Sequence, residues 1–172
     1  GMRKVPIVIG GVVLTAAYVA TPVAMRFAWD HCAEPNLMNE AGLPALSTAL
    51  EALPPNAIGQ AFIEVEGPDD EVELAAPAGV QVQWVHRGGR ADLVPADRAG
   101  DNAPLIAAVR AAEWLPGQVH AFVHGEAQTV MHNLRPYLRK ERGVGAEWAS
   151  ISGYWRRGRT EETFRQWKAE LA

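Results

Sequence analysis

Apolar and polar positions alternate along most of the chain in a way that predicts strands separated by helices. Short apolar runs, most clearly the period-two run at 80–85, predict strands at residues 61–65, 80–85, 119–123 and 149–155. Apolar residues at intervals of three and four predict helices over residues 43–53, 104–114 and 127–142, and from Thr160 onward. This order predicts a strand–helix repeat rather than an all-helical or all-strand fold.

Strands that alternate with helices over short links favour a parallel sheet covered on both faces. The fold class we expect is α/β, a three-layer α/β/α arrangement with a mainly parallel sheet of about five strands. Ligands of such sheets bind beyond the carboxyl ends of the strands. The polar, glycine-rich loop 87–102 follows one predicted strand and is expected to be mobile. Functional residues are therefore expected where strands end.

The N-terminal stretch has two interpretations. Val5–Met25 is a run of 21 residues without a charge and follows Arg3 and Lys4, which fits a signal peptide or a membrane helix. Its β-branched residues and Gly10–Gly11 also fit buried strands joined by a turn. We therefore divide the chain into an apolar arm, residues 1–35, and a domain, residues 36–172. The arm packs on the domain or, through residues 5–27, on a second copy, and membrane association through Val5–Met25 is the alternative.

Composition removes several classes of function. With 48% hydrophobic residues in 172 positions the chain can bury a core, and a net charge of −4 argues against nucleic-acid binding through overall charge. Cys32 is the single cysteine, which excludes an internal disulfide framework and a cysteine-rich metal site. His120 and His124 would lie about 13 Å apart on one face of a strand, too far to share a metal. We expect no metal site and no nucleic-acid partner.

Three groups of residues at predicted strand ends are candidates for chemistry. Arg87 suits a phosphate, because its guanidinium donates two parallel hydrogen bonds; a surface salt bridge is the alternative. Gly125 and Glu126 allow a ligand to approach the backbone closely, or they form an ordinary strand-to-helix turn. Basic residues Arg156 and Arg157 either meet an anionic ligand or balance the acidic pair 161–162.

Five segments carry a resemblance to a known family. They are L-P-A-L…L-E-A-L-P, V-Q-W-V-H-R, H-G-E-A, L-R-P-Y-L-R-K-E-R-G-V and G-Y-W-R-R-G. Their order and spacing over residues 36–159 resemble the C-terminal, NAD(P)H-binding domain of the siderophore-interacting protein family. The resemblance implies a cytoplasmic, ferredoxin-reductase-like protein. Members of that family take a hydride from NAD(P)H onto FAD and reduce ferric siderophores.

The resemblance also implies roles for individual positions. The turn with Asn39, Glu40 and Ala41 would face the pyridine nucleotide, Arg87 the adenosine phosphate, and Gly125 with Glu126 the nicotinamide. The stretch of Tyr154, Trp155, Arg156 and Arg157 would approach the flavin or the siderophore. No residue of the chain is expected to be catalytic. The family usually has G-D-E-T-A-L-P at the first turn, so a carboxylate is lost at Asn39 and a hydroxyl at Ala41.

Two functions remain open at this level. In the first, the chain is the NAD(P)H-binding half of a ferric-siderophore reductase-like protein, without its own FAD barrel and inactive in isolation. The arm, residues 1–35, would then be a vestige of the last strands of that barrel or an unrelated replacement. FAD would then come from another domain or chain, and a flavin-domain protein and a ferric siderophore would be its partners. In the second, the domain is degenerate and non-catalytic, and it acts as an interaction or dimerisation module.

Overall fold

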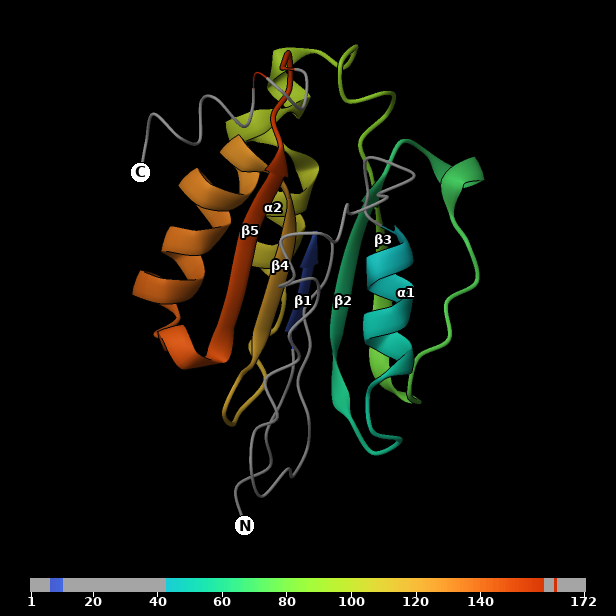
Figure 1. Ribbon diagram of the computed structural model, residues 1–172, viewed down its shortest axis with the longest axis vertical. Helices are drawn as coiled ribbons and strands as arrows, with labels where there is room; N and C mark the ends of the chain where they lie inside the picture. Colours follow the sequence, from blue (N-terminus) through green and yellow to red (C-terminus); the bar gives the residue numbers. More distant parts are fainter. Residues whose placement is uncertain (1–6, 11–42, 160–162, 164–172) are drawn as a thin grey trace.

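The computed structural model describes residues 7–10, 43–159 and 163 of the chain. Its strands run parallel in one sheet, in the order β3-β2-β1-β4-β5 (Figure 1). The strands are β1 Ile7–Gly10, β2 Ile58–Val65, β3 Gly79–His86, β4 Ala121–Glu126 and β5 Ala149–Trp155. The predicted α/β class with parallel strands is confirmed.

The middle strand, β1, comes from the N-terminal stretch. Ile7 pairs with Gln60 of β2 on one side and with Ala121 of β4 on the other. Residues Ile7–Gly10 therefore form a strand of the sheet, which agrees with the interpretation of the N-terminal stretch as buried strands. The rest of residues 5–27, and with it the predicted contact to a second copy, lies outside the described residues, as does the boundary at residue 36. No helix within the described part of the chain has the length and hydropathy to span a bilayer.

Helices flank the parallel strands. Helix α1, Leu43–Glu51, lies in front of β2 and β3 in Figure 1, and α2, Pro104–Ala111, lies behind the sheet. The core is built from apolar side chains that these elements contribute, and burial of each stabilises the fold by roughly 1.5–3 kcal/mol. Its largest members are less than 2% exposed: Leu46, Leu50, Ile63, Val109, Val123, Leu134 and Leu138.

The helix predicted over residues 127–142 forms with an unusual hydrogen-bond pattern. It consists of two π-helical segments, Gln128–Leu134 and Tyr137–Glu141, with Arg135 and Pro136 between them. The Arg142 N–H donates to the Tyr137 carbonyl at 3.0 Å, five residues back. Proline has no N–H to donate, so an interior proline disturbs the regular α-helical pattern. Pro136 lies between the two segments of wider turns.

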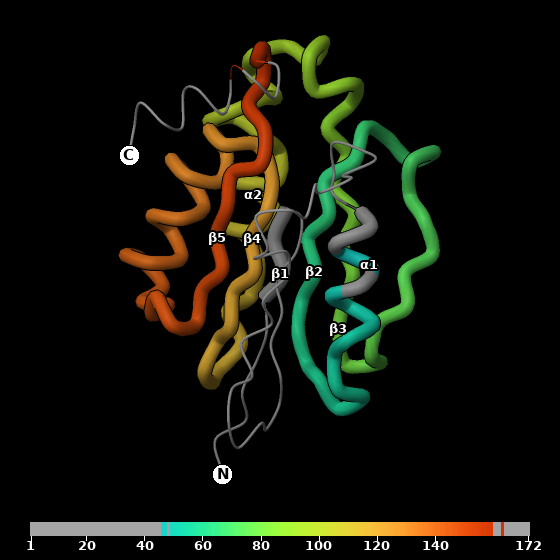
Figure 2. Tube along the Cα trace, viewed as in Figure 1, coloured from blue at the N-terminus to red at the C-terminus, as the bar shows by residue number. Residues whose placement is uncertain are grey.

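Short turns complete the described chain. The 3-10 turns are Pro68–Asp70, Ala96–Arg98, Gly100–Asn102 and Ala146–Trp148. Two of them lie in the loop that joins β3 to α2. In Figure 2 this yellow-green loop arches over the top of the molecule, where the red end of β5 also lies. The predicted helix from Thr160 falls outside the described residues, apart from Thr163.

Candidate functional site

The order of the strands selects one edge of the sheet. The chain moves outward from β1 through β2 to β3, then returns to the other side of β1 for β4 and β5. In open sheets of this kind, ligands bind at the carboxyl ends of the strands where the order reverses. The predicted turn of Asn39, Glu40 and Ala41 lies outside the described residues. The described rim is therefore made by the ends of β2 to β5 and the loop 87–103.

Arg87 directly follows β3 and is buried, with 5% of its surface exposed. Its Nη1 lies 3.5 Å from Oε1 of Glu64 on β2, and its Nε donates to the Gly89 carbonyl at 3.0 Å. The other carboxylate oxygen of Glu64 accepts from the Leu105 N–H at 3.3 Å. This ion pair ties the ends of β2 and β3 to the start of α2. The salt-bridge alternative for Arg87 is thus present, but buried instead of at the surface, and its contact with a phosphate stays a prediction.

The charge of Glu64 is held in a poorly solvated place. Burial raises the pKa of Glu64 above its ordinary value of 4.5, and the nearby Glu126 adds to the rise. The positive charge of Arg87 and the hydrogen bond from Leu105 act in the opposite direction. Burying an ion pair costs desolvation of both partners, and removal of one partner leaves an uncompensated charge. The ion pair between Glu64 and Arg87 is therefore part of the structure of the rim, and losing either partner would destabilise it.

A small cavity adjoins this ion pair. Its volume is about 10 Å³. It is lined by Glu64, Arg87, Ala91, Arg98, Ala99, Gly100, Ala103, Glu126, Thr129, Trp155 and Arg157. A space of this size holds no more than about one water molecule. The structure thus brings Arg87, Glu126 and Arg157 to one place, but the space that they share is too small for any part of a nucleotide.

Glu126 closes β4 and holds the neighbouring segments together. Its Oε2 accepts from the Thr129 N–H at 2.9 Å, and its Oε1 accepts from the Arg157 N–H at 3.4 Å. The preceding Gly125 faces the helix, since a Cβ atom there would lie 3.3 Å from Val130 Cγ2. The glycine is therefore accounted for by strand-to-helix packing, which was the alternative to ligand approach. A role of Gly125 and Glu126 near a nicotinamide stays a prediction.

Beside the small cavity lies an open depression of about 350 Å³. Its lining residues come from the loop after β3, the start of the helix after β4 and the end of β5. They are Ala96, Ala99, Gly100, Asp101, Asn102, Glu126, Gln128, Arg156 and Arg157. Two arginines with amide groups make this surface a source of hydrogen-bond donors for an anionic or polar ligand.

Asp101 fixes one wall of the depression. It accepts hydrogen bonds from Asn133 Nδ2 at 2.8 Å and from Gln128 Nε2 at 3.0 Å. These two bonds, the one from Asn133 first, lower the pKa of Asp101 below its usual range. The loop 87–103, expected to be mobile, thus has defined anchors on the helix that follows β4.

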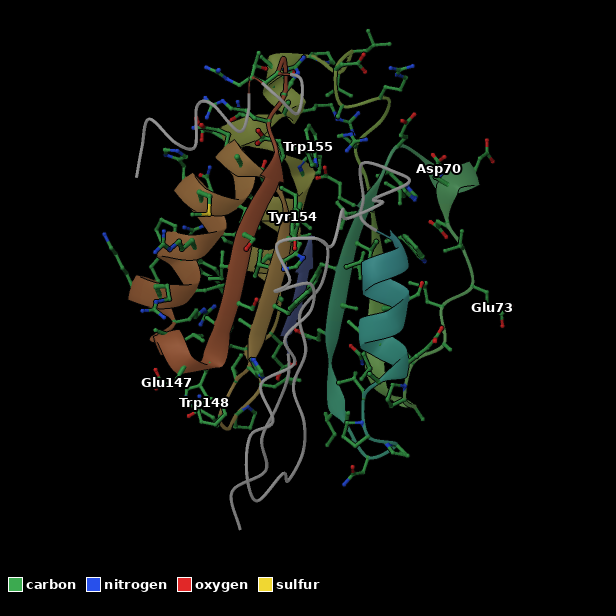
Figure 3. All side chains as sticks on the ribbon, viewed as in Figure 1. Asp70, Glu73, Glu147, Trp148, Tyr154 and Trp155 are labelled. Carbon is green, nitrogen blue, oxygen red and sulfur yellow. The ribbon has the colours of Figure 1, made fainter. Side chains whose placement is uncertain are left out.

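The residues at the end of β5 divide between two surroundings. Trp155 lines the small cavity, Arg156 lines the depression, and Arg157 lines both. Tyr154 instead packs against His124, with ring centroids 4.5 Å apart, and His124 packs against Phe122 at 3.9 Å. Figure 3 shows Tyr154 and Trp155 near the upper end of β5. The predicted group of four is therefore not one surface.

Burial governs the titration of this aromatic stack. Loss of solvation lowers the pKa of His124 to about 4 and raises the pKa of the Tyr154 hydroxyl. His124 is thus neutral near neutral pH and acts as an aromatic spacer between Phe122 and Tyr154. Within the described residues, no group of three or more His, Cys, Asp or Glu side chains is arranged to hold a metal ion.

Several residues of the rim escaped the sequence-based prediction. Glu64 carried a usable signal, because a glutamate inside the apolar strand segment A-F-I-E-V needs a buried partner. Gly100, Asp101 and Thr129 carried none. Their contacts join positions about 30 residues apart, such as Thr129 Oγ1 and the Gly100 carbonyl at 3.0 Å, which no local pattern reveals.

Comparisons with known proteins agree on one family. The family model described as "Siderophore-interacting protein" matches residues 37–158. An uncharacterized protein of Mycobacterium tuberculosis (strain ATCC 25618 / H37Rv) is 69% identical over 149 residues, which cover 85% of this chain and 53% of that protein. Ferric vibriobactin reductase ViuB of Vibrio cholerae (strain ATCC 39541 / Classical Ogawa 395 / O395) is 29% identical over 129 residues, or 72% of this chain and 43% of ViuB.

A solved structure supports the same assignment. The crystal structure of a siderophore utilization protein from T. fusca is 36% identical, with a TM-score of 0.57, and covers 69% of this chain and 42% of that one. The chain spans about half the length of the curated relatives it matches. Since the family model covers well over half of the sequence, this chain belongs to the siderophore-interacting protein family.

Proposed function

We propose that this chain is the NAD(P)H-binding part of a ferric-siderophore reductase-like protein. The observation that carries the proposal is the meeting of β4, β5 and the loop after β3 at the carboxyl edge, around a depression of about 350 Å³. That volume lies at the lower end of the range for small-molecule sites. It suits one part of a dinucleotide, with the remainder along the neighbouring strand ends.

The side chains around the depression fit a nucleotide. Arg156 and Arg157 suit the negative charge of its phosphates, and the amides of Asn102 and Gln128 add neutral donors. Carboxylates such as Asp101 suit ribose hydroxyls. In finer detail we propose the three-layer arrangement of ferredoxin-reductase-like nucleotide-binding domains, with the sheet order β3-β2-β1-β4-β5 in support.

The chemistry of the reaction belongs to the cofactors. When bound, the nicotinamide would supply a hydride, and a flavin from another domain or chain would pass its two electrons one at a time to two ferric ions held in siderophores. The residues of this chain bind and orient the nucleotide and keep the rim rigid. The cations of the β5 end also attract ferric siderophores that carry negative charge. The name ferric vibriobactin reductase of one relative supports this substrate class.

A second candidate function has its own support. Arg87 and Glu126, both predicted ligand contacts, are engaged in internal pairs and hydrogen bonds. These internal contacts would be enough for a domain that no longer binds nucleotide and serves as an interaction or dimerisation module. The two functions differ in a single measurable property, which is affinity for NADPH.

Isothermal titration calorimetry of the full chain with NADPH and NADH tests the proposal. We expect saturable binding, and an Arg156→Ala variant should bind about tenfold more weakly, because one charge-assisted contact is lost. Arg135→Ala is the matched control, because Arg135 is exposed on the helix after β4 and its substitution removes the same charge. Ferric-siderophore reduction is then followed with and without added FAD.

The outcomes separate the two functions. Saturable binding that Arg156→Ala weakens and Arg135→Ala does not supports the nucleotide site. A folded chain, shown by circular dichroism, that gives no binding heat with millimolar nucleotide would overturn the nucleotide site and leave the interaction module. Equal weakening by both variants would place the nucleotide elsewhere on the surface.

A further inference from the structure

Two hydrogen bonds from distant parts of the chain anchor the loop that forms the outer wall of the depression. The guanidinium of Arg157, after β5, donates from Nη2 to the carbonyl of Val94. The hydroxyl of Thr129, after β4, lies 3.0 Å from the carbonyl of Gly100. Both acceptors are backbone oxygens of the loop 87–103. The loop is therefore held by segments that are 63 and 29 residues away in the sequence.

One carboxylate connects the two anchors. Glu126 accepts from the Arg157 N–H with one oxygen and from the Thr129 N–H with the other. The Thr129 hydroxyl lies 3.3 Å from the same Glu126 oxygen, so it donates there or to Gly100. Hydrogen bonds to a charged group are stronger than neutral ones. We call Val94, Gly100, Glu126, Thr129 and Arg157 the rim clasp.

Within the clasp, Arg157 bonds to other segments of the protein. Its main-chain N–H and its guanidinium are both bonded to other segments of the chain, and it lines both the small cavity and the depression. A side chain that stays bound to Val94 holds the loop whether a ligand is present or not. This differs from the expectation that Arg157 meets an anionic siderophore directly.

We propose that Arg157 and Glu126 are positioning residues that fix the loop 87–103 and thereby preform the nucleotide depression. The second half of this statement rests on the proposed function; the first does not. A loop ordered before binding spares the ligand the cost of ordering it, which appears as higher affinity. Loss of the clasp should therefore loosen the loop in the free protein and weaken binding.

Hydrogen–deuterium exchange on the full chain without ligand measures the first half. In Arg157→Met, the amides of residues 93–103 should exchange about ten- to a hundredfold faster, the range expected for losing a charged hydrogen bond. Arg157→Lys keeps a donor and the charge, and it should restore part of the protection. Arg159→Met is the matched control, because Arg159 bonds to Thr163 and lies outside the clasp.

A double-mutant cycle shows whether the two residues act through one network. Glu126→Ala should speed exchange of the same amides, and the double variant should add little to the larger single effect. Multiplied effects would mean that Glu126 and Arg157 act on the loop separately, and they would contradict a single clasp. Unchanged exchange of residues 93–103 in Arg157→Met would overturn the proposal outright.

Calorimetry with NADPH separates the clasp from the proposed function. Suppose that the unmodified chain binds NADPH, and that Arg157→Met binds it at least tenfold more weakly while its loop exchanges faster. The clasp and the proposed function are then both supported. If the unmodified chain does not bind but the exchange result holds, the clasp fixes the loop and the nucleotide assignment fails. Faster exchange with unchanged NADPH affinity would overturn the claim that the clasp preforms the depression.

Discussion

The edges of the sheet at the amino and the carboxyl ends of its strands use the same kinds of charged residue in different ways. At the amino edge, where α2 and the helix after β4 finish, Arg110 lies 4.5 Å from the ring centroid of Tyr137, and Arg142 lies 4.8 Å from that of Trp114. Glu141 binds Arg110 through both oxygens, at 2.7 and 3.0 Å. At the carboxyl edge the arginines instead bond to backbone carbonyls and carboxylates around an open depression.

This difference indicates that the amino edge serves stability, and it agrees with the proposal that the nucleotide binds at the carboxyl edge. Guanidinium groups stacked on aromatic rings gain from contact area and leave no room for a ligand. Groups that bond to main-chain atoms of separate loops fix those loops and leave polar surface between them. Figure 3 shows Glu147 and Trp148 at the lower end of β5 and Tyr154 and Trp155 at its upper end. Substitutions at the amino edge should therefore change folding free energy without changing ligand affinity.

The largest effect is expected for Tyr137→Ala at the amino edge. Tyr137 is 3% exposed and packs edge-on against Trp114, so its removal leaves a cavity and two unstacked arginines. We expect the free energy of unfolding in urea to fall by about 4 kcal/mol. NADPH affinity should not change at temperatures where the variant is folded.

Tyr137→Phe is the matched control for this substitution. It keeps the ring and loses the hydrogen bond that Arg142 Nε donates to the hydroxyl at 2.8 Å, so it should cost about 1 kcal/mol. A large loss of ligand affinity in either variant would contradict the separation of the two edges.

A smaller loss of stability is expected for Glu64→Ala at the carboxyl edge. The substitution leaves Arg87 buried without its carboxylate partner, which should cost about 3 kcal/mol in the free energy of unfolding. Because Glu64 also receives the Leu105 N–H, the start of α2 and the loop beside it should loosen too. Unlike the amino-edge variant, this one should also bind NADPH more weakly. Equal affinity would show that the ion pair serves stability alone.

Glu64→Gln sharpens the same prediction through pH. Since the pKa of Glu64 is raised in the folded protein, protonation favours folding, and this contribution is full below the ordinary value of 4.5. It is lost as pH rises through the raised pKa. The wild type should therefore lose stability relative to Glu64→Gln over that window, measured by urea unfolding at several pH values. An opposite slope would mean that Arg87 outweighs the burial of Glu64.

The smallest effect is expected for acidification through His124. Its pKa of about 4 when folded lies below the ordinary 6.5, so the unfolded chain takes up the proton first. Stability present above the ordinary value should fall by about 2 kcal/mol between about pH 7 and about pH 5. His124→Phe should remove this part of the pH dependence, and an unchanged slope would contradict the assignment to His124.

Individual elements show how much of the fold the local pattern of residues predicted. The strand at 149–155 was predicted with the bounds that β5 has, and Pro104 was predicted as the start of α2. Apolar alternation and the missing N–H of proline are properties of neighbours in the chain, so the sequence displays them directly. Arg87 was located correctly at the end of a strand. Its partner Glu64 was not, because the two are 23 residues apart and only the pairing of β2 with β3 brings them together.

The sequence by itself determined the family, the strand–helix alternation and the strand ends at which polar residues gather. Those features depend on short-range periodicity and on motifs that can be read in order. Only the tertiary structure decided that Ile7–Gly10 is the middle strand, that Arg87 is buried against Glu64, and that Arg157 holds Val94. Each of these depends on which distant segments become neighbours, and that choice is made by packing of the whole core.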